Sequence, residues 1–80
     1  MLTTRQYLRT LSKDELKRLF NAANLTKIEY DLLKYAYIYK YLRDKTCLIL
    51  HIQKTKYHSI LNEALIKIDF TLKNLQKVRI

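Results

Sequence analysis

The chain has 80 residues, of which 16 are Lys or Arg and 7 are Asp or Glu, so its formal charge is +9. This density of positive charge attracts polyanions, which also release condensed counterions on binding, and it therefore favours a nucleic-acid partner. The length allows one domain, residues 1–80, with one modest core. A second domain is excluded.

Cysteine content and hydropathy indicate an intracellular protein. Cys47 is the single cysteine and cannot form an internal disulfide, which argues against a secreted disulfide scaffold. No stretch approaches the roughly 18 uncharged residues of a membrane-spanning helix, and the N-terminus lacks a signal-peptide run, so we expect a soluble protein without a membrane partner. His51 and His58 follow Cys47 at helical spacing, but without a fourth ligand a structural role for Cys47 is preferred to a zinc site. We expect no metal and no cofactor.

Gly and Pro are both absent. Turns must therefore be made by Asn, His, Ser or Lys, and strand-rich folds that depend on Gly turns are disfavoured. The sequence predicts an all-α fold, a small helical domain of four to five helices with a helix-turn-helix and a long C-terminal recognition helix.

The first two predicted elements occupy residues 2–22. Residues 2–10 are predicted either to form one or two helical turns, with Tyr7, Leu8 and Leu11 facing inward, or to be a frayed arm. Ser12 stands three residues before Glu15, a capping-box pattern that predicts a helix from Lys13 to about Ala22. Residues 21–24 supply its end, because Asn tolerates the left-handed conformation found there. The apolar face of this helix contains Leu16, Leu19, Phe20 and Ala23.

A second capping box, Thr26 and Glu29, predicts a helix from Lys27 to about Tyr41. The segment is apolar nearly all round, which is typical of a helix at the centre of a core or under a second molecule. Five tyrosines lie between Tyr30 and Tyr41. We favour packing of their rings in the core with the hydroxyls at its edge over stacking on unpaired bases.

Residues 44–68 have the outline of a helix-turn-helix. A first helix from Arg43 to Leu50, a break at residues 51–53 and a second helix from Lys54 give the short turn that this motif uses. The first helix directs Thr46, Cys47 and Leu50 toward the second. One side of the second helix is apolar, and the same spacing continues to Leu72 and Leu75, so this helix should run to about Lys77. Its apolar residues are Tyr57, Leu61, Ala64, Leu65 and Ile68.

The polar side of the second helix is the predicted DNA-reading surface, because the N-terminal half of a recognition helix enters the major groove. Asn62 is suited to adenine and Lys56 to guanine. The predicted base contacts are Lys54, Thr55, Lys56, His58, Ser59 and Asn62. The predicted phosphate contacts, near the first helix and the turn before it, are Lys40, Arg43 and Lys45.

Several residues carry a resemblance to region 4, the promoter-reading domain of bacterial sigma factors, in register over about 45 residues: Leu25, Thr26, Glu29, Leu32, Leu33, Tyr37, Cys47, Leu50, Ile52, Tyr57, Leu61, Ala64, Leu65 and Ile68. Residues 54–58 and 62–65 look more like the small sigma-like late-gene regulators of Gram-positive phages, the ArpU and RinA type. The resemblance implies a sequence-specific DNA-binding regulator of phage or mobile-element genes in the cytoplasm of a bacterial host.

The chain departs from the sigma pattern at three places. His51 stands where sigma domains usually have Gly, and Gln53 where they usually have a Ser cap. The Gly-containing loop that normally follows the helix predicted at residues 27–41 is missing, which suggests that this helix is longer than in sigma domains.

Two other classes of function were compared with DNA binding. An enzyme is not expected, since the chain has no Gly-rich phosphate loop, no repeated carboxylate pair on one face and no nucleophile beside a plausible base. The alternative is an interaction protein that binds RNA polymerase or another regulator through its helical surface. The helix 27–41 and the seam from Leu61 to Leu75 carry more apolar surface than the helix 13–22 can cover, so a homodimer is predicted, with RNA polymerase as the other occupant of that surface.

Overall fold

The computed structural model describes residues 3–77, with side chains to Asn74, and this range contains helices and no strand. The predicted all-α fold is thus confirmed. The elements in chain order are α1 (Thr4–Thr10), α2 (Lys13–Ala22), α3 (Lys27–Leu33), the π-helical segment η1 (Lys34–Ile38), α4 (Arg43–Leu50) and α5 (Lys54–Lys77).

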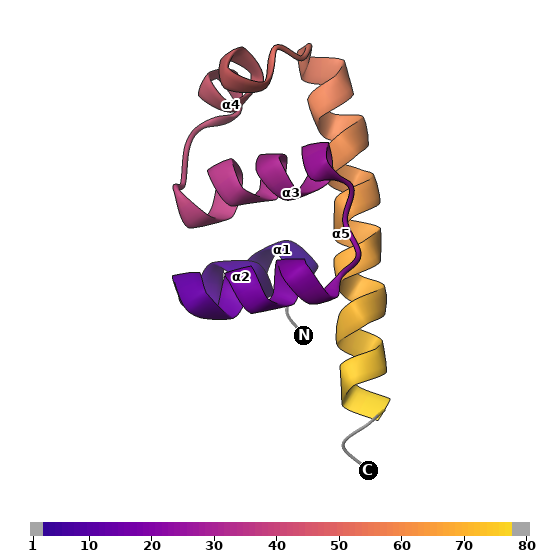
Figure 1. Cartoon of the computed structure of the whole chain (residues 1–80). Helices are drawn as coiled ribbons and strands as arrows, with labels where there is room; N and C mark the ends of the chain where they lie inside the picture. The colour runs from indigo at the N-terminus through magenta and orange to yellow at the C-terminus, as the bar shows by residue number, and fades with distance from the viewer. Residues whose placement is uncertain (1–2, 78–80) are drawn as a thin grey trace.

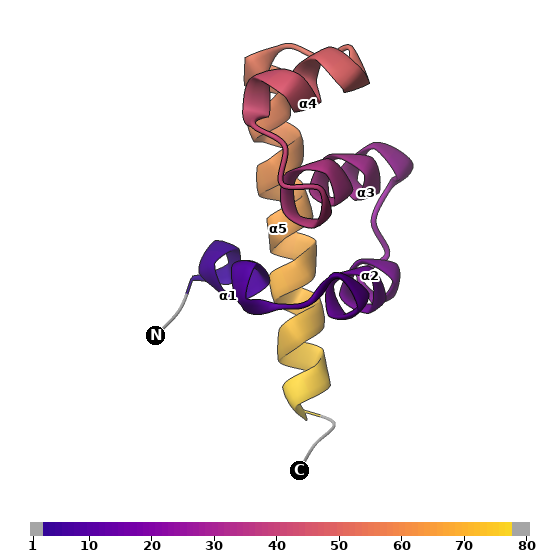
Figure 2. The same cartoon turned by 90° about the vertical axis from the view of Figure 1, so that its left-hand side faces the viewer.

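The helix α5 is the axis of the molecule, and the other helices pack along it (Figure 1). The pair α1 and α2 lies beside its C-terminal half, α3 lies beside its middle and α4 crosses its N-terminal end. Figure 2 shows α1 and α2 side by side in front of α5, one toward each edge, so both helices cover the same side of α5. The molecule is elongated, 43 × 23 × 21 Å, because its 24-residue helix extends beyond the helices that cover it.

One hydrophobic core draws on every α-helix. The four residues predicted for the apolar face of α2 are all buried, and so are four of the five predicted for α5, with Leu65 half-buried. Ile60 is also buried, which the sequence reading missed although it lies three residues beyond Tyr57 on the same side of the helix. The core consists of Leu8, Leu16, Leu19, Phe20, Ala23, Leu32, Leu33, Ile38, Cys47, Tyr57, Ile60, Leu61, Ala64 and Ile68.

The N-terminal segment is a helix from Thr4, and its inward residues are Leu8, fully buried, and Leu11, half-buried. The inward placement predicted for Tyr7 is wrong, since its side chain is exposed. The reason is geometric. Neighbouring residues on a helix point about 100° apart, so once Leu8 faces the core Tyr7 points to its edge.

Capping boxes start the first three helices. Both predicted boxes are confirmed, with the backbone N–H of Glu15 donating to Ser12 and that of Glu29 donating to Thr26. In return each Glu carboxylate accepts from the backbone N–H of its Ser or Thr. A third box, Thr3 with Gln6, starts α1. At the end of α2, Asn24 takes the left-handed conformation that the sequence predicted for this break.

The predicted continuous helix from Lys27 to Tyr41 is wrong. Helical structure widens into a π-helical turn at Lys34 and ends at Ile38. The backbone N–H of Tyr41 donates to the carbonyl of Tyr35 at 2.9 Å, and Lys40 closes the turn in the left-handed conformation, φ 59°. The turn therefore contains neither Gly nor Asn, the residues that usually occupy the left-handed position after a helix.

The tyrosines divide into two groups. Tyr30 and Tyr37 are half-buried and pack against the core, as predicted for all five. Tyr35, Tyr39 and Tyr41 instead form a cluster with one another at the end of η1, with ring centroids 5.7 to 5.9 Å apart. For these three the core prediction is wrong, because the early end of the helix turns the rings of Tyr39 and Tyr41 back onto Tyr35. We call these three residues the tyrosine cluster.

The surfaces that suggested a homodimer are mainly covered within the chain. Leu61 and Ile68 are buried and Leu65 and Leu72 pack half-buried against the core, while the side chain of Leu75 lies outside the described residues. Other apolar side chains are at least half exposed, namely Tyr39, Leu42, Leu48, Ile66 and Phe70.

Between residues 3 and 77, none of the helices combines the length and the apolar character needed to cross a membrane.

Candidate nucleic-acid interface

The two helices predicted to form the helix-turn-helix have the predicted boundaries. The first helix ends at Leu50, residues 51–53 form the turn and α5 begins at Lys54. His51 takes the left-handed conformation, φ 57° and ψ 45°, and the backbone N–H of Ile52 donates to the carbonyl of Cys47 at 3.1 Å. His51 thus adopts the geometry for which Gly is the usual residue, at a local cost of about 1 to 2 kcal/mol.

Two small side chains allow α4 to lie close against the rest of the core. Thr46 is fully buried and Cys47 is 8% exposed, as predicted for residues that face α5. Cys47 carries no hydrogen-bonding requirement that burial would violate, and it behaves as a small apolar residue. The Thr46 hydroxyl is different, since it has no hydrogen-bond partner among the described residues. It therefore costs stability at the contact that positions α4.

All six predicted base-contact residues are exposed, and they lie on the first three turns of α5. Thr55, Ser59 and Asn62 run along the middle of the exposed face, opposite the buried side chains of α5. Lys56 and His58 flank them on either side. The structure therefore brings these residues onto one open surface, which we call the α5 polar face: Thr55, Lys56, His58, Ser59 and Asn62.

An exposed ionic cluster joins the start of α4 to the start of α5. Asp44 Oδ1 lies 3.4 Å from Lys54 Nζ and 3.7 Å from Arg43 Nε. On the other side of Arg43, its Nη1 lies 3.3 Å from His58 Nε2. Exposed pairs of this kind contribute little stability, about 0 to 1 kcal/mol each, so the cluster mainly positions cations. Lys54 is consequently held at the edge of the α5 polar face.

The role of Asp44 was missed by the sequence reading. Its only visible signal was an acidic residue in the first turn of a predicted helix, which suits the helix dipole. The contact with Lys54 depends on how the turn folds one helix back on the other. Spacing along the chain does not encode it.

The three predicted phosphate contacts are exposed but divided between two places. Arg43 belongs to the ionic cluster beside α5. Lys45 Nζ lies 4.0 Å from the ring centroid of Tyr41, in a cation–π contact with the tyrosine cluster, and Lys40 lies in the left-handed turn that precedes α4. Between them, Leu42 is the N-cap of α4 and makes no side-chain cap hydrogen bond. The first backbone N–H groups of α4 thus have no side-chain acceptor from their cap.

Burial changes the acid–base behaviour of Tyr57, the first buried residue of α5. Desolvation raises the pKa of the Tyr57 phenol above its ordinary value, with smaller contributions from Tyr37 and Cys47. Tyr57 therefore stays neutral across the physiological range. Its ring meets the ring of His58 edge-on at a centroid distance of 5.6 Å, which links the buried and exposed sides of the helix.

A partly buried ion pair fixes α5 against α3, with Glu29 buried and the Lys67 side chain 38% exposed. Glu29 is 3% exposed, and its Oε1 accepts a hydrogen bond from Lys67 Nζ at 2.7 Å. Burial by itself raises the pKa of Glu29, but the hydrogen bonds from Lys67 and Thr26 outweigh it, so the pKa lies below its ordinary value. Glu29 therefore remains charged at neutral pH and neutralises Lys67, which is not free to bind an anion.

Residues 3–77 contain no group of three or more His, Cys, Asp and Glu side chains placed to hold a metal ion. Comparison with known protein families, with curated proteins and with solved structures found no match to this chain.

Proposed function

We propose that the chain is a sequence-specific domain for double-stranded DNA that regulates transcription, with the first half of α5, within residues 54–68, in the major groove. The observation that carries this proposal is the exposure of a continuous polar face at the start of the long helix α5, which a three-residue turn joins to α4. Side chains with hydroxyl, amide and imidazole groups lie there between flanking lysines, and these groups suit base edges.

Phosphate contacts would come from the α4 side of the same end of the molecule. Arg43, Lys45 and Lys40 lie around the start of α4, and its uncapped first turn offers backbone N–H groups with the positive end of the helix dipole. Contacts of this type fix the register of a protein on the duplex without reading sequence. Asp44 would also lie near the phosphate backbone of the DNA, but Arg43 and Lys54 compensate its negative charge.

The biological setting of the proposal rests on the sequence resemblance to sigma region 4 and to ArpU- and RinA-type phage regulators. It implies control of late genes of a phage or mobile element in the cytoplasm of a bacterial host, with RNA polymerase as a second partner. The measured result that would support it is activation of such promoters in a host extract.

Selection from random duplexes tests the sequence-reading part of the proposal. The chain should enrich one motif, and the double substitution Ser59→Ala with Asn62→Ala should lose it, because each good base contact discriminates by about 1 to 3 kcal/mol. Asn74→Ala is the matched control, since Asn74 is an exposed amide near the other end of the same helix. If the double variant enriched the same motif as the wild type, the α5 polar face would not be the reading surface.

The alternative function is an interaction module for RNA polymerase or another regulator. One observation favours it, the exposure of Leu48, 76%, beside a groove that α4, the turn and α5 form. A Leu48→Ser variant with unchanged DNA binding but lost capture of the polymerase would support this class. Loss of DNA binding alone would count against it.

A further inference from the structure

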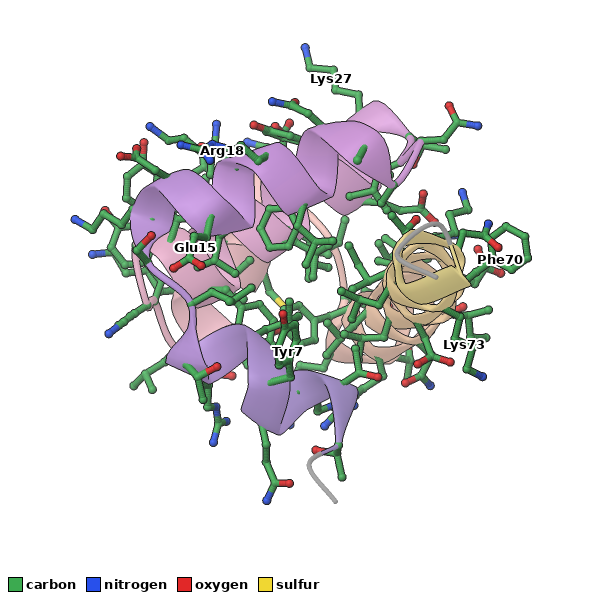
Figure 3. The ribbon with its side chains drawn as sticks, turned by 90° about the horizontal axis from the view of Figure 1, so that it is seen from below. Tyr7, Glu15, Arg18, Lys27, Phe70 and Lys73 are labelled. Atoms are coloured by element: carbon green, nitrogen blue, oxygen red, sulfur yellow. The ribbon has the colours of Figure 1, made fainter. Side chains whose placement is uncertain are left out.

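The exposed side of α5 carries a second pattern, of which the proposed function uses only Ser59. Ser59, Glu63, Ile66, Phe70 and Lys73 follow one another in steps of four, three, four and three residues, and all five are exposed. This spacing places them in one stripe along the helix, opposite the buried side. At its centre, Ile66 is 68% and Phe70 66% exposed. Figure 3 shows Phe70 and Lys73 pointing away from the helices that form the core.

The stripe is a ridge with a groove on either side. One groove runs between Ile66 and Phe70 and the end of α2 at Ala22 and Asn24. The other lies between Ile66 and the first residues of α1, around Thr4. A surface that offers both an apolar ridge and adjoining grooves can pack against a copy of itself, since helices associate by fitting ridges into grooves.

The charges on the stripe are complementary for one arrangement of two copies. Suppose that two α5 helices pack antiparallel through their stripes, with the two-fold axis at the height of residue 68 along the helix. Residues equally distant in sequence from residue 68 then face each other. Ile66 then meets the partner's Phe70, and Glu63 meets the partner's Lys73. Within its own helix Lys73 Nζ lies 3.1 Å from Asp69 Oδ2, an exposed pair that the ammonium can share with the partner's carboxylate. A parallel arrangement would instead place each charge against its own kind. We propose that a second copy of this chain docks on the stripe of α5 in this antiparallel arrangement.

The association should be weak. Only two large apolar side chains per copy are buried, an interface at the small end of the range for specific complexes, and two copies of charge +9 repel each other. We expect dissociation constants in the micromolar range or above. At about 0.15 M salt the screening length is about 8 Å, which suppresses the net repulsion while leaving the close cross-pairs.

The dimer would compete with DNA, an inference that also rests on the proposed function. Ser59 belongs both to the stripe and to the α5 polar face, and Asn62 lies beside it. A helix docked along the stripe therefore covers part of the reading surface. Self-association would keep the chain off DNA at high concentration, and duplex DNA would dissociate the dimer.

Charge reversal tests the dimer without any DNA present. Sedimentation equilibrium is measured for the wild type, for Glu63→Lys, for Lys73→Glu, for an equimolar mixture of these two variants and for the double-reversed chain. Each single variant places like charges opposite each other twice per dimer, so its association should weaken at least tenfold. The mixture and the double-reversed chain restore opposite charges and should associate as the wild type does. Circular dichroism checks that each exposed substitution leaves the helical fold intact.

A wild type that stays monomeric, single variants that associate like the wild type, or a mixture that remains monomeric would each overturn the dimer. None of these results affects the proposal of DNA binding. The competition is tested separately, by adding random duplex to the wild-type dimer. If the dimer is established and the duplex binds it without dissociating it, the α5 polar face is not the DNA-reading surface.

Discussion

Glu29 has two structural roles, because it caps the start of α3 and also holds α5 against α3. Its carboxylate closes the capping box with Thr26 and accepts from Lys67 on α5, although it is almost completely buried. A charge in such a place is tolerated only when it is fully paired, and removal of one partner leaves the other uncompensated. Sequence reasoning found the cap, which is local. It could not find Lys67, which lies 38 residues away.

Replacement of Glu29 by Gln separates these two roles, since Gln can close a capping box but carries no charge. We expect a loss of about 1 to 3 kcal/mol in the free energy of unfolding at neutral pH. Because the folded protein lowers the pKa of Glu29, its contribution is present above the ordinary value of 4.5 and is lost as the pH falls through the folded-state pKa.

The difference in stability between wild type and Glu29→Gln, measured by urea unfolding, should therefore shrink below about pH 4. Glu15→Gln is the matched control, because Glu15 closes the same type of box on α2 but is exposed. An equal acid dependence in both variants would show that the Lys67 pair contributes nothing.

Thr46 leads to the opposite expectation. Its hydroxyl is buried without a hydrogen-bond partner among the side chains described, which end at Asn74, and Val has nearly the same shape without the polar atom. Thr46→Val should raise the free energy of unfolding by about 1 kcal/mol, because desolvation of an unpaired hydroxyl no longer opposes folding. Thermal unfolding measures this, with Thr55→Val, at an exposed position of α5, as control. A lower melting temperature for Thr46→Val would reveal a hydrogen bond that the hydroxyl makes in solution.

The ends of the elements show how far local signals reach. The starts of α2 and α3 were predicted to the residue because Ser12 with Glu15, and Thr26 with Glu29, satisfy backbone donors within one turn. The end of α2 was also predicted, since Asn24 is a residue type that adopts the left-handed conformation readily. The end of the next helix was missed because Lys40 occupies the same conformation.

The turn after η1 depends on contacts that a periodicity cannot show. The rings of Tyr35 and Tyr41 stack with an interplanar angle of 8°, and the cations of Lys34 and Lys45 lie over them. In sequence these tyrosines read as an apolar continuation of the helix. Only the fold reveals that they close a turn on the surface.

The start of α4 allows stability and function to be separated. Leu42 is the N-cap, is 81% exposed and makes no cap hydrogen bond, whereas Ser or Asp at this position would accept from the first turn. Leu42→Ser and Leu42→Asp should each stabilise the domain by about 1 kcal/mol. Leu42→Asp should in addition weaken DNA binding, since its carboxylate would lie where a phosphate is expected.

Both quantities are measured on the same preparations, by thermal unfolding and by binding to a labelled duplex. Leu42→Ser is the control for the charge. Should Leu42→Asp bind DNA as tightly as Leu42→Ser, the N-terminus of α4 would not lie near the DNA backbone.

At the scale of the whole molecule, stability depends on the side of α5 that the other helices cover. Ile68 is fully buried and Leu65 half-buried, so Ile68→Ala should cost about 2 to 5 kcal/mol and Leu65→Ala less. A domain of this size has about 5 kcal/mol or little more in total. Ile68→Ala is therefore expected to be partly unfolded near 37 °C, which far-UV circular dichroism would detect. Equal melting temperatures for the two variants would contradict the described packing.

The sequence predicted which residues of the candidate interface are exposed, but it did not predict the contacts among its charged residues. The polar residues between positions 54 and 62 were expected on the exposed side of a helix, and a period of 3.6 residues is sufficient to derive that. The Asp44 cluster and the separation of Arg43 from Lys45 required the path of the turn and the position of the tyrosine cluster. Exposure of Ile66 and Phe70 was not foreseen because their stripe lies opposite the apolar side on which the sequence reading concentrated.

The salt dependence of binding to random duplex DNA tests most directly the central claim, that DNA contacts the end of the molecule where α4 meets α5. A net charge of +9 attracts DNA to any face of a chain, so the wild-type slope alone would not locate the contact. Each phosphate contact contributes about −0.9 to the slope of log K against log salt. Arg43→Gln and Lys45→Gln should each make the slope about one unit less steep, and Lys17→Gln, an exposed position on α2, should leave it unchanged. Equal slopes for all three variants, or a change confined to Lys17→Gln, would contradict the claim.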